Sequence, residues 1–375
     1  MKFKNMIKVD PVILITLIVL LGIGLIFIYN SSFVFSNLKF KDQYFFVKRQ
    51  GLAILFGMSC LIGFSMIPYK AYFKFVPLMI IVTIISLGLL YVPGLGVKVG
   101  GATRWLKFPF FNLQVSEFAK IVMIFYLASI FSKKTKGHIN NLQKGILPLV
   151  VVCGAIVGLI LMEPDFGTAF TILVISFFMF VVCGIRFRHI LGLFIVLFPI
   201  VYYLIFNFDY RKKRILSFLN PWADPQNSGF QIIQSFVAFQ NGGINGVGLG
   251  EGKQALLFLP EVHTDFIFSV IGEELGFIGA CLIIFLFLVL ISRTFLISLR
   301  LEDKFGSFLI FGMALMISIQ VIFNLGVVTA LLPTKGLPLP FISYGGSSLI
   351  ANLICMGIIL NASKEVRNTK FILGV

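Results

Sequence analysis

The stretch PVILITLIVLLGIGLIFIY, residues 11–29, contains no charged side chain, and as a helix it is about as long as the hydrocarbon core of a bilayer is thick. A second uncharged run, ILPLVVVCGAIVGLILM at residues 146–162, has the same character. Backbone polar groups in lipid must be bonded within the spanning structure, so each run is predicted to be a membrane-spanning helix.

Composition extends this interpretation to the whole chain. Of its 375 residues, 58% are hydrophobic and 12% are charged, whereas a soluble domain carries about 25% charged residues. A net charge of +16 would suggest nucleic-acid binding in a soluble protein. Here many Lys and Arg lie in short loops between apolar runs, as the positive-inside rule requires, so we expect no nucleic acid. The first run is too long for a signal-peptide core and lacks a small-residue cleavage site, so it remains as the first helix.

The predicted fold class is all-α: a polytopic integral membrane protein whose residues 1–375 form a single transmembrane domain. Short loops favour a cytoplasmic N-terminus, and an even number of spans places both termini there. About ten spans are expected, near residues 11–30, 47–67, 72–92, 115–131, 145–162, 167–184, 189–207, 265–291, 305–332 and 342–362.

One long segment, residues 208–264, is predicted to lie outside the membrane between the seventh and eighth spans. It is amphipathic and glycine-rich, and loops of this length in compact proteins are usually functional or disordered. Two further segments rich in Gly and Pro, residues 92–110 and 332–348, fall on the same predicted side. Irregular backbone at membrane depth is tolerated only where it lines protein or a wet cavity, so we expect a site at the outer face.

Glu117 and Lys120 open the fourth span in SEFAKIVMIFYLASIF. Ionisable residues inside a membrane are costly unless they are paired or wet. Three residues apart on a helix, these two share a face and can form an ion pair. The pair is either a structural device that orients the helix or part of the wall of a polar cavity.

The sequence EPDFG places Glu163 and Asp165 in a short connection between the fifth and sixth spans. Such a connection is an interfacial turn, and its carboxylates are either solvated or part of an outer site. Arg104, beside Trp105, also has two interpretations. The arginine is suited to an anionic headgroup or phosphate, whereas tryptophan there is also an ordinary interfacial anchor.

The segment FLPEVHTDFIFSVIGEELG, residues 258–276, concentrates acidic residues at the eighth span. Glu261, His263 and Asp265 lie where this span begins, and a Glu pair at 273 and 274 is expected roughly 12 Å further along the helix. A carboxylate at a membrane mouth can act as a general base, its pKa tuned by burial and by neighbours such as His263 or Lys120. It can equally relay protons or bind a cation, and side-chain chemistry alone leaves these alternatives open.

Seven strings, taken in order, resemble the SEDS family of bacterial cell-wall proteins (FtsW, RodA and SpoVE). They are GATRWL at 101–106, FNLQVSEFAK at 111–120, EPDFGTA at 163–169, GFQIIQS at 229–235, GGINGVGLG at 242–250, LPEVHTDFIFSVIGEELGFIG at 259–279 and GLPLPFISYGGSS at 336–348.

The resemblance implies a ten-span peptidoglycan glycosyltransferase that polymerises lipid II at the outer face of the cytoplasmic (inner) membrane. Its implied partners are a class B penicillin-binding protein, which crosslinks the strands, and other divisome or elongasome membrane proteins. Asp265 matches the family's essential outer-loop aspartate, and Trp105 matches its functionally sensitive tryptophan. Glu117 and Lys120 match an acidic and basic pair that lines the central cavity.

In this interpretation Asp265 takes the proton from the acceptor sugar hydroxyl, and cations hold the departing undecaprenyl pyrophosphate. No side-chain cluster forms a metal cage, although a divalent ion (Mg or Mn) bridging pyrophosphate and a carboxylate remains open. The candidate cations are Arg104, Lys120, Arg211, Arg214 and Lys335. The further candidate cavity residues are Trp105, Glu117, Glu163, Asp165, Gln234, Glu261, His263 and Ser343.

VPGLGVKVGGATRWL and EPDFG look more like the FtsW division branch, because RodA sequences more often carry QPD in the second motif. One departure is Val115, where the family usually has proline before the serine and glutamate; proline suits a first helical turn. The alternatives are a RodA-like elongation polymerase, a lipid II flippase, and a non-catalytic scaffold for a penicillin-binding protein. Clustering of the charged motifs at the outer ends of the spans argues against a translocation path.

Overall fold

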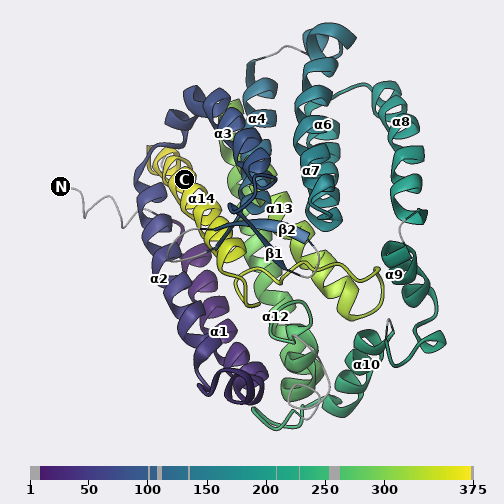
Figure 1. Ribbon diagram of the computed structural model, residues 1–375. Coiled ribbons are helices and arrows are strands. Elements are labelled where there is room, and N and C mark those ends of the chain that lie inside the picture. The colour runs from purple at the N-terminus through teal and green to yellow at the C-terminus, as the bar shows by residue number, and fades with distance from the viewer. Residues whose placement is uncertain are drawn as a thin grey trace.

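The computed structural model describes residues 9–99, 102–107, 112–133, 136–207, 209–227, 229–252 and 262–372. Nine helices in this part of the chain are long and apolar enough to cross a membrane, and α8 contains a shorter apolar stretch, Phe187–Val196. The protein is therefore an all-helical polytopic membrane protein, apart from one small sheet (Figure 1).

Each predicted span corresponds to one of ten hydrophobic helices. These are α1 (Pro11–Phe40), α2 (Phe45–Met66), α3 (Val76–Leu89), α4 (Val115–Lys133), α6 (Leu147–Met162), α7 (Phe166–Cys183), α8 (Phe187–Phe206), α12 (Ile267–Arg300), α13 (Lys304–Val328) and α14 (Gly346–Ile372). Three short helical elements precede two of these helices: η2 (Tyr69–Phe75) lies before α3, and α5 (Lys136–Ile139) and η3 (Leu142–Ile146) lie before α6.

Helices α4, α13 and α14 form the centre of the bundle, because most of their residues are buried by other helices. Helix α2 lies along α14 (Figure 1). The two approach so closely that a Cβ added at Gly357 would lie 2.6 Å from the carbonyl oxygen of Leu61. The outward face of α2 exposes Leu52, Leu55 and Phe56, as expected for a helix that faces lipid.

A three-stranded antiparallel sheet lies at the start of α4. Its strands, in order, are β1 (Gly96–Val99), β2 (Ala102–Lys107) and β3 (Asn112–Gln114), with Trp105 opposite Gln114. Ser347, near the start of α14, accepts a hydrogen bond from Gln114 N at 3.0 Å and donates one to Asn112 O at 3.3 Å. The sequence did not predict this sheet, which ties the starts of α4 and α14 together.

The long segment between α8 and α12 contains α9 (Asp209–Leu219), the turn η4 (Pro221–Ala223) and α10 (Phe230–Gly242). Helix α10 packs against the first part of α12. The glycine-rich residues that follow α10 cross this part of α12, and Val247 N donates to Glu273 O at 3.0 Å.

The span predicted near residues 265–291 corresponds to α12 (Ile267–Arg300), but the sequence did not predict an interruption inside this helix. Helix α12 begins at Ile267, after Asp265, and is interrupted at Gly276, whose φ of 65° and ψ of −165° are not helical. Only glycine adopts this conformation readily. The glycine-rich segment packs against the break, where the amide N–H of Gly248 donates to the carbonyl oxygen of Glu274 at 3.1 Å. The Glu pair therefore lies on a short helical piece between Asp265 and the break.

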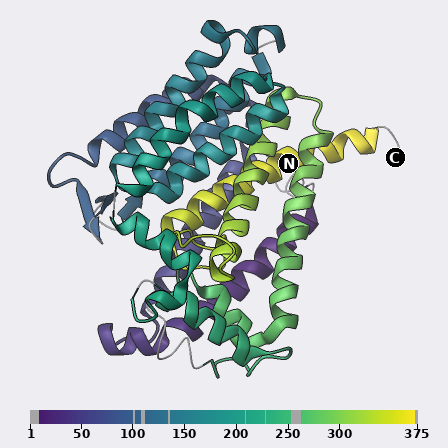
Figure 2. The ribbon, with the colours of Figure 1, turned by 90° about the vertical axis from the view of Figure 1, so that its right-hand side faces the viewer.

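The two ends of the bundle differ. Figure 2 shows the β-strands projecting at one end, and the start of α1 and the end of α14 at the other. Helix α12 runs along the bundle from Ile267, two residues after Asp265, to Arg300. Asp10, before α1, bonds to Arg293 near the end of α12 and to Ser363 of α14, so both ends of the described chain lie away from Asp265.

Candidate active site

Asp265 lies in the turn that leads into α12, and Asn324 of α13 holds its backbone. The Nδ2 group of Asn324 donates to the carbonyl oxygens of Asp265, at 2.8 Å, and of Leu337, at 2.9 Å. A Cβ added at Gly336 would lie 3.2 Å from Oδ2 of Asp265. One buried amide therefore fixes the half-buried Asp265 against the segment 335–337.

Lys335, on the same segment, lies among three phenylalanine rings. Its Nζ is 3.4 Å from the ring centroid of Phe170, 4.6 Å from that of Phe323 and 5.6 Å from that of Phe166. The rings attract the ammonium through their quadrupoles. Burial nevertheless lowers the pKa of Lys335 to about 7, because the charged form loses its water.

Two arginines donate hydrogen bonds to backbone carbonyls close to Lys335 and Phe166. Arg214 of α9 donates from Nη1 to the carbonyl of Thr334 at 3.1 Å, next to Lys335. Arg104 of β2 donates from Nη2 to the carbonyl of Pro164 at 2.6 Å, two residues before Phe166. The structure thus gathers three of the five predicted cations, Arg104, Arg214 and Lys335, around two adjacent segments.

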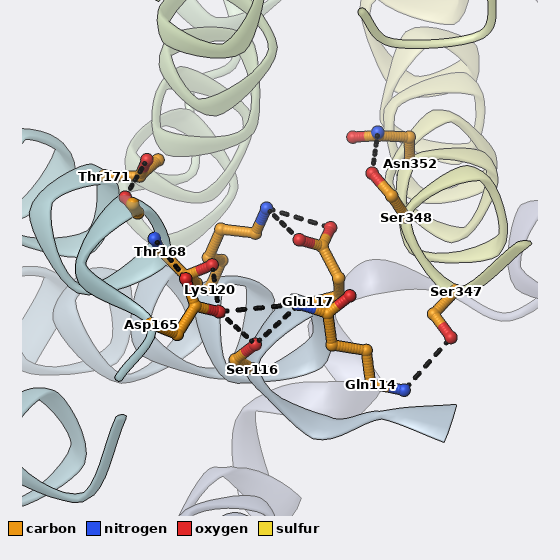
Figure 3. A network of polar contacts seen from close by, with 11 residues as sticks. Gln114, Ser116, Glu117, Lys120, Asp165, Thr168, Thr171, Ser347, Ser348 and Asn352 are labelled. Atoms are coloured by element: carbon orange, nitrogen blue, oxygen red, sulfur yellow. Dashed lines mark hydrogen bonds and ion pairs between the residues drawn. The ribbon is translucent and has the colours of Figure 1, made fainter. Parts of the chain in front are cut away.

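Lys120 is not part of that group. Its Nζ donates to both carboxylate oxygens of Glu117, at 2.9 Å each, and neither side chain is more than 4% exposed (Figure 3). The predicted ion pair therefore forms, and it is buried in the first turns of α4. Ser348 and Asn352 of α14 lie across from the pair in Figure 3, which makes this part of the interior polar.

Several buried oxygens in this interior accept no hydrogen bond. They include the side-chain oxygens of Gln320, Asn324 and Asn352, all on α13 and α14. A buried acceptor without a partner is costly and calls for water or a ligand donor. Both interpretations of Glu117 and Lys120, as a pair that orients the helix and as part of a cavity wall, stay predictions.

Asp165 connects α7 to the start of α4 (Figure 3). Its carboxylate caps α7 by accepting from Thr168 N at 3.2 Å and Thr168 Oγ1 at 2.8 Å. It also accepts from Ser116 Oγ at 3.1 Å and Gln114 Nε2 at 3.4 Å. Asp165 is therefore a fully bonded structural residue, only 5% exposed.

Glu163 is 1% exposed, and neither of its carboxylate oxygens accepts a hydrogen bond. Burial, reinforced by the nearby carboxylate of Asp165 and partly offset by Arg104, raises the pKa of Glu163 to about 8. The interpretation of EPDFG as a solvated turn is therefore wrong. The turn connects α6 to α7, and both of its acidic residues are buried, although Pro164 between them is exposed.

His263 packs among aromatic rings instead of adding charge beside Asp265. Its ring centroid is 4.2 Å from that of Phe46 and 5.5 Å from that of Tyr344. Burial lowers its pKa to about 4, so the imidazole is neutral. Ser343 is likewise structural: its Oγ accepts from Leu339 N at 2.9 Å, and its carbonyl accepts from Gln50 Nε2 at 3.2 Å.

The remaining predicted residues are less closely defined. Trp105 is half-buried on β2, and Gln234 is half-buried on α10 beside Ser235, whose Oγ accepts from Ser269 Oγ at 3.0 Å. Glu261 and the side chain of Arg211 lie outside the described residues.

Sequence reasoning missed Asn324, Gln50 and the three phenylalanines around Lys335. Asn324 was recognisable in principle, because an amide within the apolar run IQVIFNLGV is a candidate functional residue by its location in the membrane. The phenylalanines carried no signal, because the chain contains 44 of them.

Comparison with known proteins places these features in context. A family model described as cell cycle protein, covering FtsW, RodA and SpoVE, matches residues 11–368. The probable peptidoglycan glycosyltransferase FtsW of Geobacter metallireducens is 44% identical over 369 residues, which are 98% of each chain. Stage V sporulation protein E of Bacillus subtilis is 40% identical over 358 residues, 96% of this chain and 97% of that protein.

The fold also matches a solved structure, described as the structural coordination of polymerization and crosslinking by a peptidoglycan synthase complex. The TM-score is 0.79 at 26% sequence identity, and the match covers 96% of this chain and 98% of the other.

Proposed function

This chain belongs to the FtsW/RodA/SpoVE family of cell cycle proteins, and we propose that it is an FtsW-like peptidoglycan glycosyltransferase that polymerises lipid II. The family predicted from seven sequence motifs is thus confirmed. The observation that carries the mechanism is the position of Asp265 against the Lys335 segment, with Asn324 bonded to both.

Asp265 is the proposed general base. It takes the proton from the acceptor sugar hydroxyl while that oxygen bonds to the anomeric carbon of the growing chain. The bond from this carbon to undecaprenyl pyrophosphate breaks at the same time, and inversion at the carbon makes a β-linked glycan. A partly exposed carboxylate with a fixed backbone is suited to this role, because its position need not be reorganised during reaction.

The pyrophosphate leaving group carries negative charge that cations must hold. Lys335, Arg214 and Arg104 are the described candidates, because their side chains attach to neighbouring segments. Arg211 is retained from the sequence as a fourth. Each guanidinium group can donate two parallel hydrogen bonds to phosphate oxygens. Lys335 contributes one positive charge, which depends on pH because burial lowers its pKa.

A divalent cation remains an optional addition. Among the described residues, no three His, Cys, Asp or Glu side chains gather as a metal site. Mg²⁺ or Mn²⁺ would therefore take most of its ligands from pyrophosphate and water, as Mg²⁺ often does beside phosphates. No step above depends on it.

Orientation and partners follow the same proposal. The chain would lie in the cytoplasmic membrane of a bacterium with both termini inside, so that Asp265 faces outward. Crosslinking would be supplied by a class B penicillin-binding protein. The similarity to a synthase complex described as coordinating polymerization and crosslinking supports such a partner in general.

The experiment uses the purified chain with its partner transpeptidase in detergent, given labelled lipid II. Detergent removes the two separate compartments that a flippase needs, so glycan chains on a gel support polymerisation. If the chain is a non-catalytic scaffold, polymer will form only when a separate glycosyltransferase is added. Absence of polymer under all conditions, together with transfer of lipid II across vesicles, would contradict the proposal.

A further inference from the structure

The end of the bundle opposite Asp265 contains a cavity of mixed polar and apolar lining, between α1, α12 and α14. Its volume is about 250 Å³, and Figure 2 shows the start of α1 and the end of α14 near α12 at this end. The lining residues are Asp10, Pro11, Arg293, Leu296, Ile297, Arg300, Ser363 and Val366. None of them takes part in the site described above.

Asp10 organises the cavity. Its carboxylate caps α1 by accepting from Val12 N at 3.0 Å and Ile13 N at 3.4 Å, and its own amide donates to Ser363 Oγ at 3.1 Å. The second carboxylate oxygen accepts from Nε of Arg293 at 2.7 Å. Asp10 therefore positions Arg293 through the Nε of the arginine. The two Nη groups of Arg293 have no hydrogen-bond partner among the described residues.

Arg300 supplies a second guanidinium. It lies two helical turns beyond Arg293 on the same face of α12, about 10 Å along the axis. It is exposed and has no partner within the described part of the chain. Leu296 and Ile297 lie between the two arginines, so the cavity combines a basic edge with an apolar wall.

The depth of the cavity suits a lipid headgroup. From Gly276, where the uninterrupted part of α12 begins, the helix rises about 26 Å to Arg293 and about 36 Å to Arg300. The hydrocarbon core of a bilayer is about 30 Å thick, so the two arginines bracket its boundary. Leu299, which is 77% exposed, continues the apolar surface beside them.

The net positive charge of the cavity lining favours an anionic ligand. Two guanidiniums against one carboxylate leave the cavity with excess positive charge. The preceding residues of this chain, MKFKNMIK, are themselves basic and so do not complement it. Guanidinium groups bind phosphate through paired hydrogen bonds, and basic pockets between transmembrane helices are known to take anionic headgroups. The volume equals about eight water molecules at about 30 Å³ each, which accommodates a phosphate and a small alcohol.

We propose that this cavity binds the phosphate headgroup of an anionic glycerophospholipid from the adjacent leaflet. The phosphate lies between Arg293 and Arg300, and the acyl chains lie along the exposed leucines of α12. Such a lipid joins α1, α12 and α14 at the end of the molecule remote from Asp265.

The test is native mass spectrometry of the purified chain in detergent, titrated with phosphatidylglycerol, phosphatidylcholine or inorganic phosphate. The variant Arg300→Gln leaves every described contact intact, and Arg293→Gln is a second variant. Arg186→Gln is the matched control, because Arg186 is exposed at the same end of the bundle but lies outside the cavity. Asp10→Asn retains a capping residue while it removes the competing charge.

Phosphatidylglycerol is expected to bind the wild-type chain more tightly than phosphatidylcholine does. Arg300→Gln and Arg293→Gln should each weaken it about fivefold, the value for one basic residue near a membrane surface, and Arg186→Gln should not. Asp10→Asn should tighten binding. Equal binding by Arg300→Gln and wild type, or equal loss in Arg186→Gln, would overturn the proposal. Displacement of phosphatidylglycerol by millimolar inorganic phosphate would overturn the lipid as the ligand.

Discussion

The ammonium nitrogen of Lys335 lies 3.4 Å from the ring centroid of Phe170, and burial there lowers the pKa of Lys335 to about 7. A lysine that binds pyrophosphate must be protonated. The free enzyme therefore holds this cation below about pH 7 and loses it as the pH rises further.

We expect kcat/KM for polymerisation to fall as the pH rises above about 7, because kcat/KM reports the ionisation of the free enzyme. Lys335→Arg should retain activity and abolish this fall, since arginine stays protonated. Lys335→Met should be weak at every pH. The control is Lys107→Arg, at an exposed position of β2, which should keep the wild-type profile. An unchanged alkaline limb in Lys335→Arg would show that another group titrates.

Glu163 predicts a pH dependence of stability. Its pKa is about 8 in the folded protein and near 4.5 when exposed, so the folded state binds more protons between these values. Stability is then fully present below about pH 4.5 and decreases as the pH rises toward 8, by at most about 1.4 kcal/mol per pH unit. Glu163→Gln should flatten the change in thermal midpoint between pH 6 and pH 8.5. A midpoint that falls equally in the wild type and the variant would contradict this origin.

The ion pair of Glu117 and Lys120 predicts strong coupling between the two residues. Lys120→Met leaves a buried carboxylate and should destabilise the fold by about 3 to 5 kcal/mol. The double variant Glu117→Gln with Lys120→Met should recover part of this loss. Lys48→Met is the control, because the ion pair of Lys48 with Asp42 is exposed and should contribute less than about 1 kcal/mol. Equal thermal midpoints for Lys120→Met and Lys48→Met would contradict this, and would show that water solvates the carboxylate of Glu117.

Gly336 predicts a local effect on Asp265. A Cβ at this position would lie 3.2 Å from Oδ2 of Asp265, so Gly336→Ala should displace the carboxylate by a few tenths of an ångström. We expect activity to fall between about twofold and tenfold with little loss of stability, because small misplacements of reacting groups slow catalysis. Gly345→Ala, in the same loop, meets no atom closer than 3.8 Å and should be neutral. Equal rates for the two variants would remove Gly336 from the site.

The helical architecture could be predicted from the sequence because lipid allows few solutions. Runs such as residues 146–162 must satisfy their backbone internally, and this alone predicts α6. The break at Gly276 could not be predicted, because it depends on a glycine-rich segment about thirty residues earlier that packs against α12. The sheet at residues 96–114 was missed for a related reason: its strands are short, and glycine and proline dominate the segment around it.

The candidate site was only partly predictable. Asp265, Lys335 and Arg214 were identified from charge and from family resemblance, but their arrangement depends on Asn324 and on three phenylalanines. His263 was expected to tune the pKa of a neighbouring carboxylate, whereas it packs against Phe46 and burial lowers its own pKa to about 4. Spacing along a chain shows which residues share a helix face. It does not show which distant aromatic rings will exclude water from a side chain.

The central claim is that Asp265 is the base, and the decisive measurement is polymerisation of labelled lipid II by Asp265→Asn with its partner transpeptidase. Asparagine has nearly the same shape but cannot take the proton, so we expect a loss of at least about a hundredfold. Partner binding should be unchanged. Asp42→Asn, the same substitution at an exposed ion pair, is the control and should remain active. Wild-type polymer from Asp265→Asn would contradict the account.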